Sequence, residues 1–117
     1  MRIYSLYICV EDMKRAIQFY EDFFNKKVDV KDKIYSVFCI GTFRFGLFDY
    51  KKESEIHTIG NNCLPSIEVE KLDIGRVKNV LKKYKRQITF PETIIGDNIV
   101  FEFKDTESNT IEVTVPR

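Results

Sequence analysis

The sequence predicts an α+β protein of two tandem βαβββ modules, which form a curved mixed sheet with a concave cleft. Two observations support this prediction. Hydrophobic residues alternate, then recur every three or four residues, and then alternate again. This order occurs twice within 117 residues, which is the length of one domain. We expect a single domain, residues 1–117, with module 1 at about 1–50, a linker at about 51–62 and module 2 at about 63–117.

The first module begins with a strand from Ile3 to Val10, in which apolar side chains alternate. An amphipathic helix follows from about Met13 to Phe24, with Asp12 as its N-cap and Asn25 at its C-terminal end. Three strands are expected next, near Val28–Val30, Ile34–Ile40 and Thr42–Tyr50, and Gly41-Thr42 is the expected tight turn between the last two.

The second module repeats this order. Its first strand is Pro65–Glu70, and turns are expected at Gly96-Asp97 and around Ser108. Ile8 matches Ile67 at an offset of 59, and the offset grows only across loops. The expected helical stripe is Leu72, Val77, Val80, Leu81 and Tyr84, and the later strands are Ile88–Phe90, Ile94–Ile95, Asn98–Lys104 and Asn109–Val115.

Composition disfavours several classes of function. A net charge of +1 gives no overall field to attract nucleic acid or an acidic membrane. No apolar run is long enough to span a bilayer, and no signal peptide is recognised at the start. Three widely spaced cysteines fit neither a disulfide framework nor a zinc site. We therefore expect a cytoplasmic protein with reduced thiols and with no nucleic-acid or membrane partner.

Three motifs then resemble one family. Val10–Tyr20 (VEDMKRAIQFY) is similar to a strand that runs into V-x-D-x-x-x-A-x-x-F-Y, and Ile67–Asp73 is similar to its counterpart in the second half. Phe101–Val113 (FEFKDTESNTIEV) resembles F-x-F-x-D-P-x-G-N-x-I-E-L, with Thr106 and Ser108 in place of Pro and Gly. Together the motifs resemble the glyoxalase/bleomycin-resistance/dioxygenase superfamily, also called the vicinal oxygen chelate superfamily.

The resemblance implies four positions for metal ligands, usually two His and two Glu. These positions carry Ser5, Gly46, Leu64 and Glu112 in this chain. Ser is a poor ligand for a transition metal, and Leu and Gly side chains offer no donor atom. We therefore expect neither a metal nor another cofactor, and no catalytic residue is assigned.

Strand alternation predicts which side chains share the concave face with these positions. Ser5 shares a face with Tyr7 and Cys9, and Gly46 shares one with its neighbours two residues away. The predicted ligand-binding cleft consists of Ser5, Tyr7, Arg44, Gly46, Phe48, Leu64, Ser66, Glu68 and Glu112.

Several of these residues have two interpretations. Glu112 can act as a general base or anchor a cationic ligand, or it can be a solvated carboxylate paired with Arg44 or a lysine. Cys9 is either a nucleophile or a packed thiol. Tyr7 and Phe48, with Tyr35 or Phe38, form either an aromatic wall for a planar ligand or part of a closed core.

Two further features lie outside the predicted cleft. His57, the single histidine, falls in the polar linker and is expected to be exposed. The basic run Lys82–Arg86, with Lys78, can contact phosphate, or it can complement the helix dipole and keep the surface hydrated.

The sequence favours a metal-free protein that binds a small molecule in the cleft. The alternatives are a metal-dependent lyase, isomerase or dioxygenase-like enzyme with displaced ligands, and a dimeric interaction module without a ligand. We also expect a homodimer, because family members commonly pair and sheet edges need cover.

Overall fold

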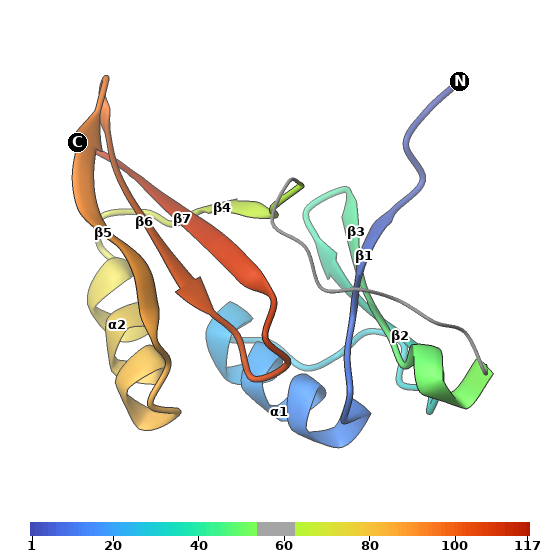
Figure 1. The fold of residues 1–117 in the computed structure, drawn as a ribbon. Coiled ribbons are helices and arrows are strands. Elements are labelled where there is room, and N and C mark those ends of the chain that lie inside the picture. The colour runs from blue at the N-terminus through green and yellow to red at the C-terminus, as the bar shows by residue number, and fades with distance from the viewer. Residues whose placement is uncertain (54–62) are drawn as a thin grey trace. The chain divides into compact units, whose positions relative to one another are not determined.

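The computed structural model describes residues 1–53 and 63–117. The chain divides into two compact units, Met1–Ile59 and Gly60–Arg117, which are described separately below. The expected βαβββ order is complete in unit 2, whereas unit 1 has the order βαββ and one isolated bridge in place of its remaining strand (Figure 1). We expected one sheet to serve both halves. Hydrogen bonds divide the described strands into two sheets instead, one in each unit.

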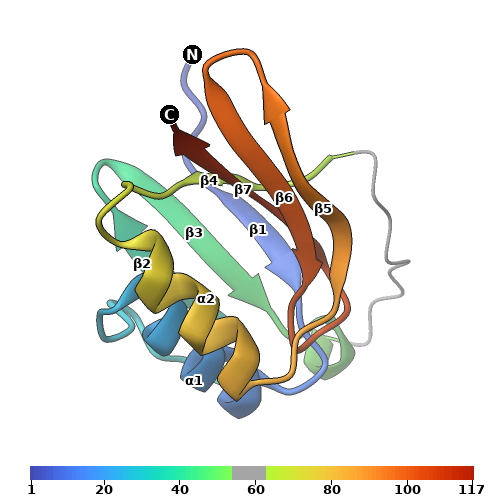
Figure 2. The ribbon, with the colours of Figure 1, turned by 90° about the vertical axis from the view of Figure 1, so that its left-hand side faces the viewer.

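Unit 1 is a three-stranded sheet with one helix on it. Its elements are β1 (Leu6–Cys9), α1 (Met13–Phe24), β2 (Tyr35–Ile40), β3 (Phe43–Phe48) and the short 3-10 helix η1 (Tyr50–Glu53). The strand order is β1-β3-β2, with β1 parallel and β2 antiparallel to β3 (Figure 2). The parallel pair requires a crossover connection, and α1 supplies part of it.

Both predicted ends of α1 are confirmed. The Asp12 carboxylate accepts a hydrogen bond from the Arg15 amide at 3.1 Å, as an N-cap does. Asn25 adopts the left-handed conformation with φ of 55°, and its amide donates to the Glu21 carbonyl.

An aromatic core joins α1 to one face of the unit 1 sheet. Tyr20 is fully buried, and its ring centroid lies 5.2 Å from that of Phe45. The ring centroids of Phe24 and Phe38 lie 5.4 Å apart. Ring pairs at these distances add to the free energy gained from burying their area. The helix therefore covers the face that carries Phe38 and Phe45, and the opposite face carries Tyr7 and Gly46.

One predicted strand of unit 1 is not formed. Val28–Val30 contributes only an isolated bridge between Val30 and Val37. The Asp29 and Val30 amides both turn to the Val37 carbonyl, at 3.0 Å each, so the segment does not continue as a ladder.

Unit 2 has four strands and one helix. Its elements are β4 (Ser66–Glu68), α2 (Ile74–Lys83), β5 (Ile88–Ile95), β6 (Asn98–Lys104) and β7 (Thr110–Pro116). The order is β4-β7-β6-β5, with β4 parallel to β7 and the remaining pairs antiparallel. Figure 1 shows α2 alongside strands β5 and β6.

The sequence placed one residue of α2 wrongly. Leu72 was expected in the buried stripe, but it precedes the helix and is 99% exposed. The Asp73 amide donates to the Glu70 carbonyl, so a turn occupies this segment before α2 begins at Ile74. Val77 and Leu81 are buried as expected.

Strand β5 is longer than expected. The two short runs around Phe90 and Ile94 join into one strand, and the register shifts twice between Ile88 and Thr93. Pro91 lies within this irregular stretch. Because β5 is an edge strand, it tolerates a residue that has no amide proton.

The same pairing register occurs in both units and confirms the internal repeat. Tyr7 pairs with Gly46 in unit 1, and Ser66 pairs with Glu112 in unit 2. In each unit the first strand is short and runs parallel to the last strand, β3 or β7. Gly46 and Glu112 therefore occupy equivalent positions on these last strands. Within the described ranges, neither helix is long and apolar enough to cross a membrane.

Candidate functional site

The face of unit 1 opposite α1 carries a compact aromatic cluster. The Tyr7 ring makes edge contacts with Tyr35 and Phe48, at centroid distances of 5.8 and 5.4 Å. The Ser5 and Tyr35 hydroxyl oxygens lie 3.4 Å apart, and either can donate. The structure therefore brings four predicted site residues, Ser5, Tyr7, Gly46 and Phe48, around the Tyr35 side chain.

Gly46 is the residue that makes room for Tyr35. A Cβ atom at position 46 would lie 2.6 Å from Tyr35 Cζ and still closer to the Tyr35 hydroxyl oxygen. It would also lie 2.9 Å from Tyr7 Cβ. Any side chain at position 46 would have to displace the Tyr35 ring, so the volume that such a side chain needs is already filled.

Tyr35 itself is positioned by the turn that precedes β2. The Asp32 carboxylate accepts hydrogen bonds from the Ile34 and Tyr35 amides, at 2.9 and 3.1 Å. These backbone hydrogen bonds, first that of Ile34, hold the pKa of Asp32 below its usual value. The Ser36 hydroxyl also donates to the Asp32 carbonyl at 2.8 Å. The start of β2 is therefore fixed on both sides of Tyr35.

Arg44 lies one pleat from Gly46 on the same face. Its guanidinium carbon is 5.0 Å from the centroid of the Tyr4 ring, which is a cation–π distance. Its Nε atom is buried, and no described residue accepts a hydrogen bond from it. Arg44 therefore supplies positive charge beside the aromatic cluster.

The corresponding face of unit 2 is polar. The Ser66 hydroxyl donates to Glu112 Oε1 at 2.6 Å and lies 3.3 Å from the Thr114 hydroxyl oxygen. Glu102 stands directly opposite Glu112 across the β6–β7 ladder, and Glu68 pairs in register with Thr114. This face is rich in carboxylate oxygens, and Leu64, which precedes β4, is half-buried.

A family model for the Glyoxalase/Bleomycin resistance protein/Dioxygenase superfamily matches residues 2–113, which is nearly the whole chain. The chain belongs to this superfamily. A comparison with curated protein sequences finds no match.

Several solved structures share the fold of this superfamily member. A hypothetical protein from S. aureus has a TM-score of 0.80 and 17% identity, with 98% of this chain and 94% of that chain covered. A fosfomycin resistance protein from Mesorhizobium loti has a TM-score of 0.75 and 15% identity, with 99% and 92% covered. A glyoxalase/dioxygenase from Nostoc punctiforme has a TM-score of 0.76 and 14% identity, with 99% and 91% covered. At these identities the likeness extends to the fold alone.

The superfamily's C-terminal motif forms a structural turn in this chain. Asp105 is buried, and its Oδ1 accepts hydrogen bonds from the Glu107 and Asn109 amides at 2.8 Å each. Ser108, which stands where the motif has Gly, takes a φ of 70°. This left-handed conformation costs conformational energy for any residue except Gly. Ser108 nevertheless adopts it, so the turn of the motif is formed although the Gly is absent.

The donor atoms at the four positions that the resemblance implies for metal ligands do not fit a divalent ion. Ser5 directs its hydroxyl to Tyr35, Gly46 has no side chain, and Leu64 is apolar. Glu112 alone offers a carboxylate of ligand quality. Across residues 1–53 and 63–117, no group of three or more His, Cys, Asp or Glu side chains is placed to hold a metal ion.

The structure assigns a face to each predicted site residue but leaves one expectation open. Ser5, Tyr7, Arg44, Gly46 and Phe48 share one face of unit 1. Ser66, Glu68 and Glu112 share one face of unit 2, and Leu64 lies just before β4. The expected convergence of positions 5, 46, 64 and 112 stays a prediction. His57 lies outside the described residues.

Sequence reasoning left the central residue of the unit 1 face undecided. Sequence alternation leaves Tyr35 and Phe38 as alternatives, because it does not fix which residues of β2 share a face with Gly46. The ladder settles it: Tyr35 pairs with Phe48 on the site face, and Phe38 pairs with Phe45 on the helix face. A usable signal was Gly46, since a glycine inside an otherwise bulky strand indicates close approach of another group.

Proposed function

We propose that this protein binds a small organic molecule without a metal ion, using the sheet faces that its helices do not cover. The observation that supports this proposal most strongly is the Tyr35 side chain. It fills the space beside Gly46, where the superfamily resemblance implies a ligand carboxylate, and its hydroxyl meets Ser5 at a second implied ligand position. Two hydroxyl groups thus replace two metal donors.

The unit 1 face favours a ligand with a planar or apolar body. Tyr7, Tyr35 and Phe48 present ring edges and faces, and Tyr7 is 49% exposed, so part of the cluster is accessible. The Ser5 and Tyr35 hydroxyls and the Arg44 guanidinium can donate hydrogen bonds to an oxygen atom of the ligand. A planar molecule with a carbonyl or similar acceptor group matches this set.

The unit 2 face favours a different group. Glu102 and Glu112 are like charges in register, and such a pair is stabilised when a donor or a cation lies between the carboxylates. A hydrogen-bond donor or amino group of a ligand matches Glu112 best. Mutating each face separately tests whether each of them contributes to binding.

A thermal-shift screen of planar small molecules tests the proposal. A ligand that binds only the native state raises the melting temperature. Tyr35→Phe removes the hydroxyl and keeps the ring, and should weaken binding with little change in the melting temperature of the protein alone. Thr93→Val, a comparable loss of one hydroxyl on edge strand β5, serves as the control. A library without hits, or hits that are insensitive to Tyr35→Phe, would contradict the assignment of this face.

Two further properties are proposed. A homodimer is expected because β5 and β2 are sheet edges within their units, and light scattering across a concentration series tests it. A cytoplasmic location is proposed from the number and wide spacing of Cys9, Cys39 and Cys63 in the sequence, a pattern that is not typical of a disulfide framework.

A further inference from the structure

We infer a second binding site in unit 2, between α2 and the strands β5 and β6, for a small amphiphilic anion. This site is independent of the proposed function above. It lies on the helix side of the sheet, whereas Ser66 and Glu112 lie on the opposite side. The pocket has a volume of about 540 Å³, within the size range of small-molecule sites.

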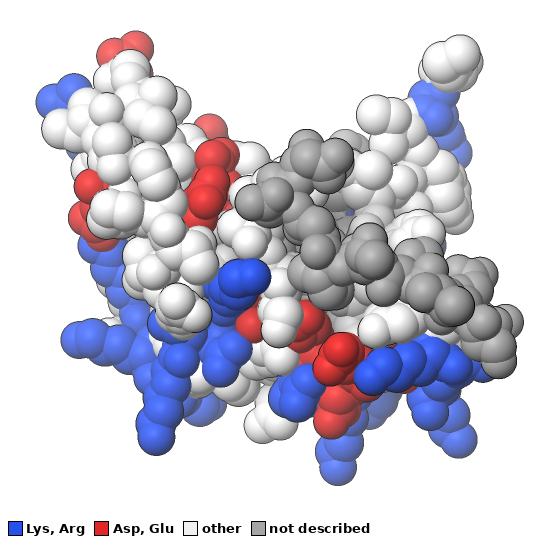
Figure 3. Space-filling view, viewed as in Figure 1, with Lys and Arg blue, Asp and Glu red and all other residues white. Residues whose placement is uncertain are grey.

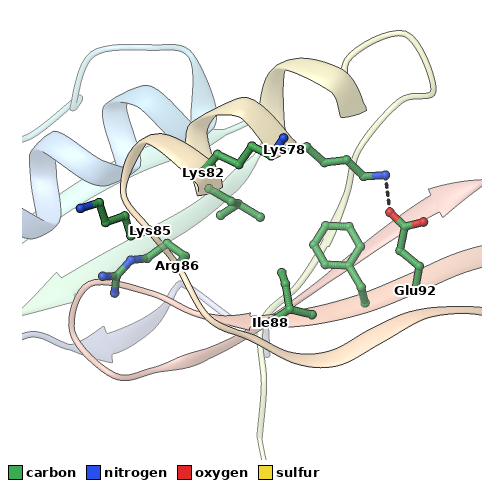
Figure 4. A pocket seen from close by; sticks show the side chains of 8 residues that line it. Lys78, Lys82, Lys85, Arg86, Ile88 and Glu92 are labelled. Atoms are coloured by element: carbon green, nitrogen blue, oxygen red, sulfur yellow. Dashed lines mark ion pairs between the residues drawn. The ribbon is translucent and has the colours of Figure 1, made fainter.

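The floor of the pocket is apolar. Leu81 and Phe101 line it and are 5% and 3% exposed, and Ile88 extends the apolar surface outward at 48% exposed. Figure 4 shows Ile88 on the strand side, facing the helix across the pocket. An alkyl or aryl group placed here would remove this surface from water.

The rim of the pocket is cationic. Four cationic side chains line the pocket, those of Lys78, Lys82, Lys85 and Arg86. The carboxylate of Glu92 is the single negative charge among the lining residues. Glu92 is paired with Lys78 at one end of the pocket, and Arg86 stands near the other end (Figure 4). In the described part of the chain, neither Lys82 nor Lys85 forms an ion pair. Lys and Arg side chains gather around this part of unit 2 (Figure 3), although the net charge of the chain is only +1.

These cations are not needed to cap the helix. The Lys85 amide donates to the Lys82 carbonyl at 3.0 Å, and the Arg86 amide donates to the Leu81 carbonyl at 2.9 Å. This pair of bonds is a Schellman motif, in which the backbone itself satisfies the last carbonyls of α2. The Lys82 and Lys85 ammonium groups therefore remain available to a ligand.

Lys85 occupies a position where glycine is preferred. Its φ is 54°, the left-handed conformation that ends a Schellman motif, and a side chain there carries a conformational cost. The chain thus keeps a positive charge at the pocket rim where local stability alone favours Gly. This conflict between local preference and residue type is typical of a functional position.

Arg86 is held in place by two backbone acceptors. Its Nε donates to the Tyr84 carbonyl and its Nη1 donates to the Asp105 carbonyl, both at 2.9 Å. No described residue accepts a hydrogen bond from Nη2. A guanidinium fixed in this way loses little freedom when it binds a carboxylate or a phosphate.

Titrations of the full-length chain with octanoate, octyl phosphate and octyltrimethylammonium, followed by amide NMR, test the site. The two anions should shift signals confined to α2, β5 and β6, and the tighter of the two identifies the preferred head group. The cation has the same tail and should not bind. Signals that shift equally with the cation, or that are spread over both units, would overturn the inference.

Charge-reversal variants localise the effect. Lys82→Glu/Lys85→Glu should weaken anion binding about tenfold or more, since repulsion replaces attraction at two rim positions. The control Lys14→Glu/Lys71→Glu makes the same change of charge at two exposed lysines outside the pocket and should leave binding within about twofold. Equal weakening in both variants would show a general charge effect and would refute the site.

Lys85→Gly separates a structural role from a binding role, and it remains informative if the charge-reversal variant fails to fold. Glycine relieves the left-handed conformation, so the melting temperature should rise. Anion binding should nevertheless weaken, because one rim cation is lost. A variant that gains stability and binds octanoate and octyl phosphate as tightly as the parent chain would contradict the inference.

Discussion

The two units share a strand register, but equivalent positions in them carry different side chains. In unit 1 Tyr7 of β1 pairs with Gly46, and the space beside this glycine is filled by Tyr35. In unit 2 Ser66 of β4 pairs with Glu112, whose carboxylate accepts a hydrogen bond from the Ser66 hydroxyl. The internal repeat thus places backbone positions equivalently in both units. The chemistry at each position depends on its own side chain and on the neighbouring side chain that fills the space beside it.

Gly46→Ala provides the largest expected effect. The added methyl group collides with the Tyr35 ring and Tyr7 Cβ, and overpacking of this kind costs about 1–3 kcal/mol of unfolding free energy. Urea denaturation measures this cost. In a Tyr35→Ala background the cost should be smaller by about 1 kcal/mol, because the two residues are in contact. Equal costs in both backgrounds would show that Tyr35 does not occupy this space.

Ser66→Ala is the matched test in unit 2 and should have a smaller effect. It removes the hydrogen bond to Glu112 on a partly exposed face, which corresponds to about 0.5–1 kcal/mol of unfolding free energy. In a Glu112→Ala background, Ser66→Ala should change the free energy of unfolding very little, because the acceptor of this hydrogen bond is already absent. Strict additivity of the two substitutions in urea denaturation would argue against the hydrogen bond.

The smallest expected effects concern acid sensitivity in the two units. The pKa of Asp32 in unit 1 is lowered by backbone amides, and that of Asp73 in unit 2 is lowered mainly by hydrogen bonds from Arg76, at 2.8 and 2.9 Å. A lowered folded-state pKa contributes stability above the unfolded-state pKa, and this stability is lost as the pH falls through the folded-state value. Both contributions should therefore begin to decrease at about pH 4 and be lost progressively as the pH falls further.

Salt should distinguish these two carboxylates. Mobile ions screen the partly exposed Asp73–Arg76 ion pair, whereas they affect backbone hydrogen bonds less. High salt should raise the pKa of Asp73 toward its usual value and leave the pKa of Asp32 more nearly unchanged. Carbon-detected NMR titration of the two carboxyl groups measures both values, and parallel shifts would refute the assigned causes.

Much of the fold could be predicted from the sequence because its signals are local. The α1 boundaries follow from Asp12 and Asn25, whose side chains and dihedral preferences act within one helical turn. The Gly41 and Gly96 turns, at φ of 59° and 60°, follow from the conformational freedom of glycine. The repeat was readable because the offsets change only in loops.

The errors arise where tertiary structure decides. Leu72 fits the helical period of α2, but a turn closed by the Asp73 amide and the Glu70 carbonyl occupies this segment. The helix begins only at Ile74 and so excludes Leu72. Val28–Val30 has strand propensity, but its amides converge on one carbonyl. For the candidate site, alternation gave the faces of Ser5, Gly46 and Glu112, whereas the role of Tyr35 required the β2–β3 register, which is a long-range property.

Equilibrium dialysis of the purified protein against Zn²⁺, Ni²⁺ and Mn²⁺, followed by elemental analysis, tests the central claim most directly. The claim is that Tyr35 and Gly46 leave too few donor atoms at the superfamily's metal positions. It predicts well below one ion per chain and no change in Glu112→Gln. One tightly held ion per chain that is lost in Glu112→Gln would contradict it.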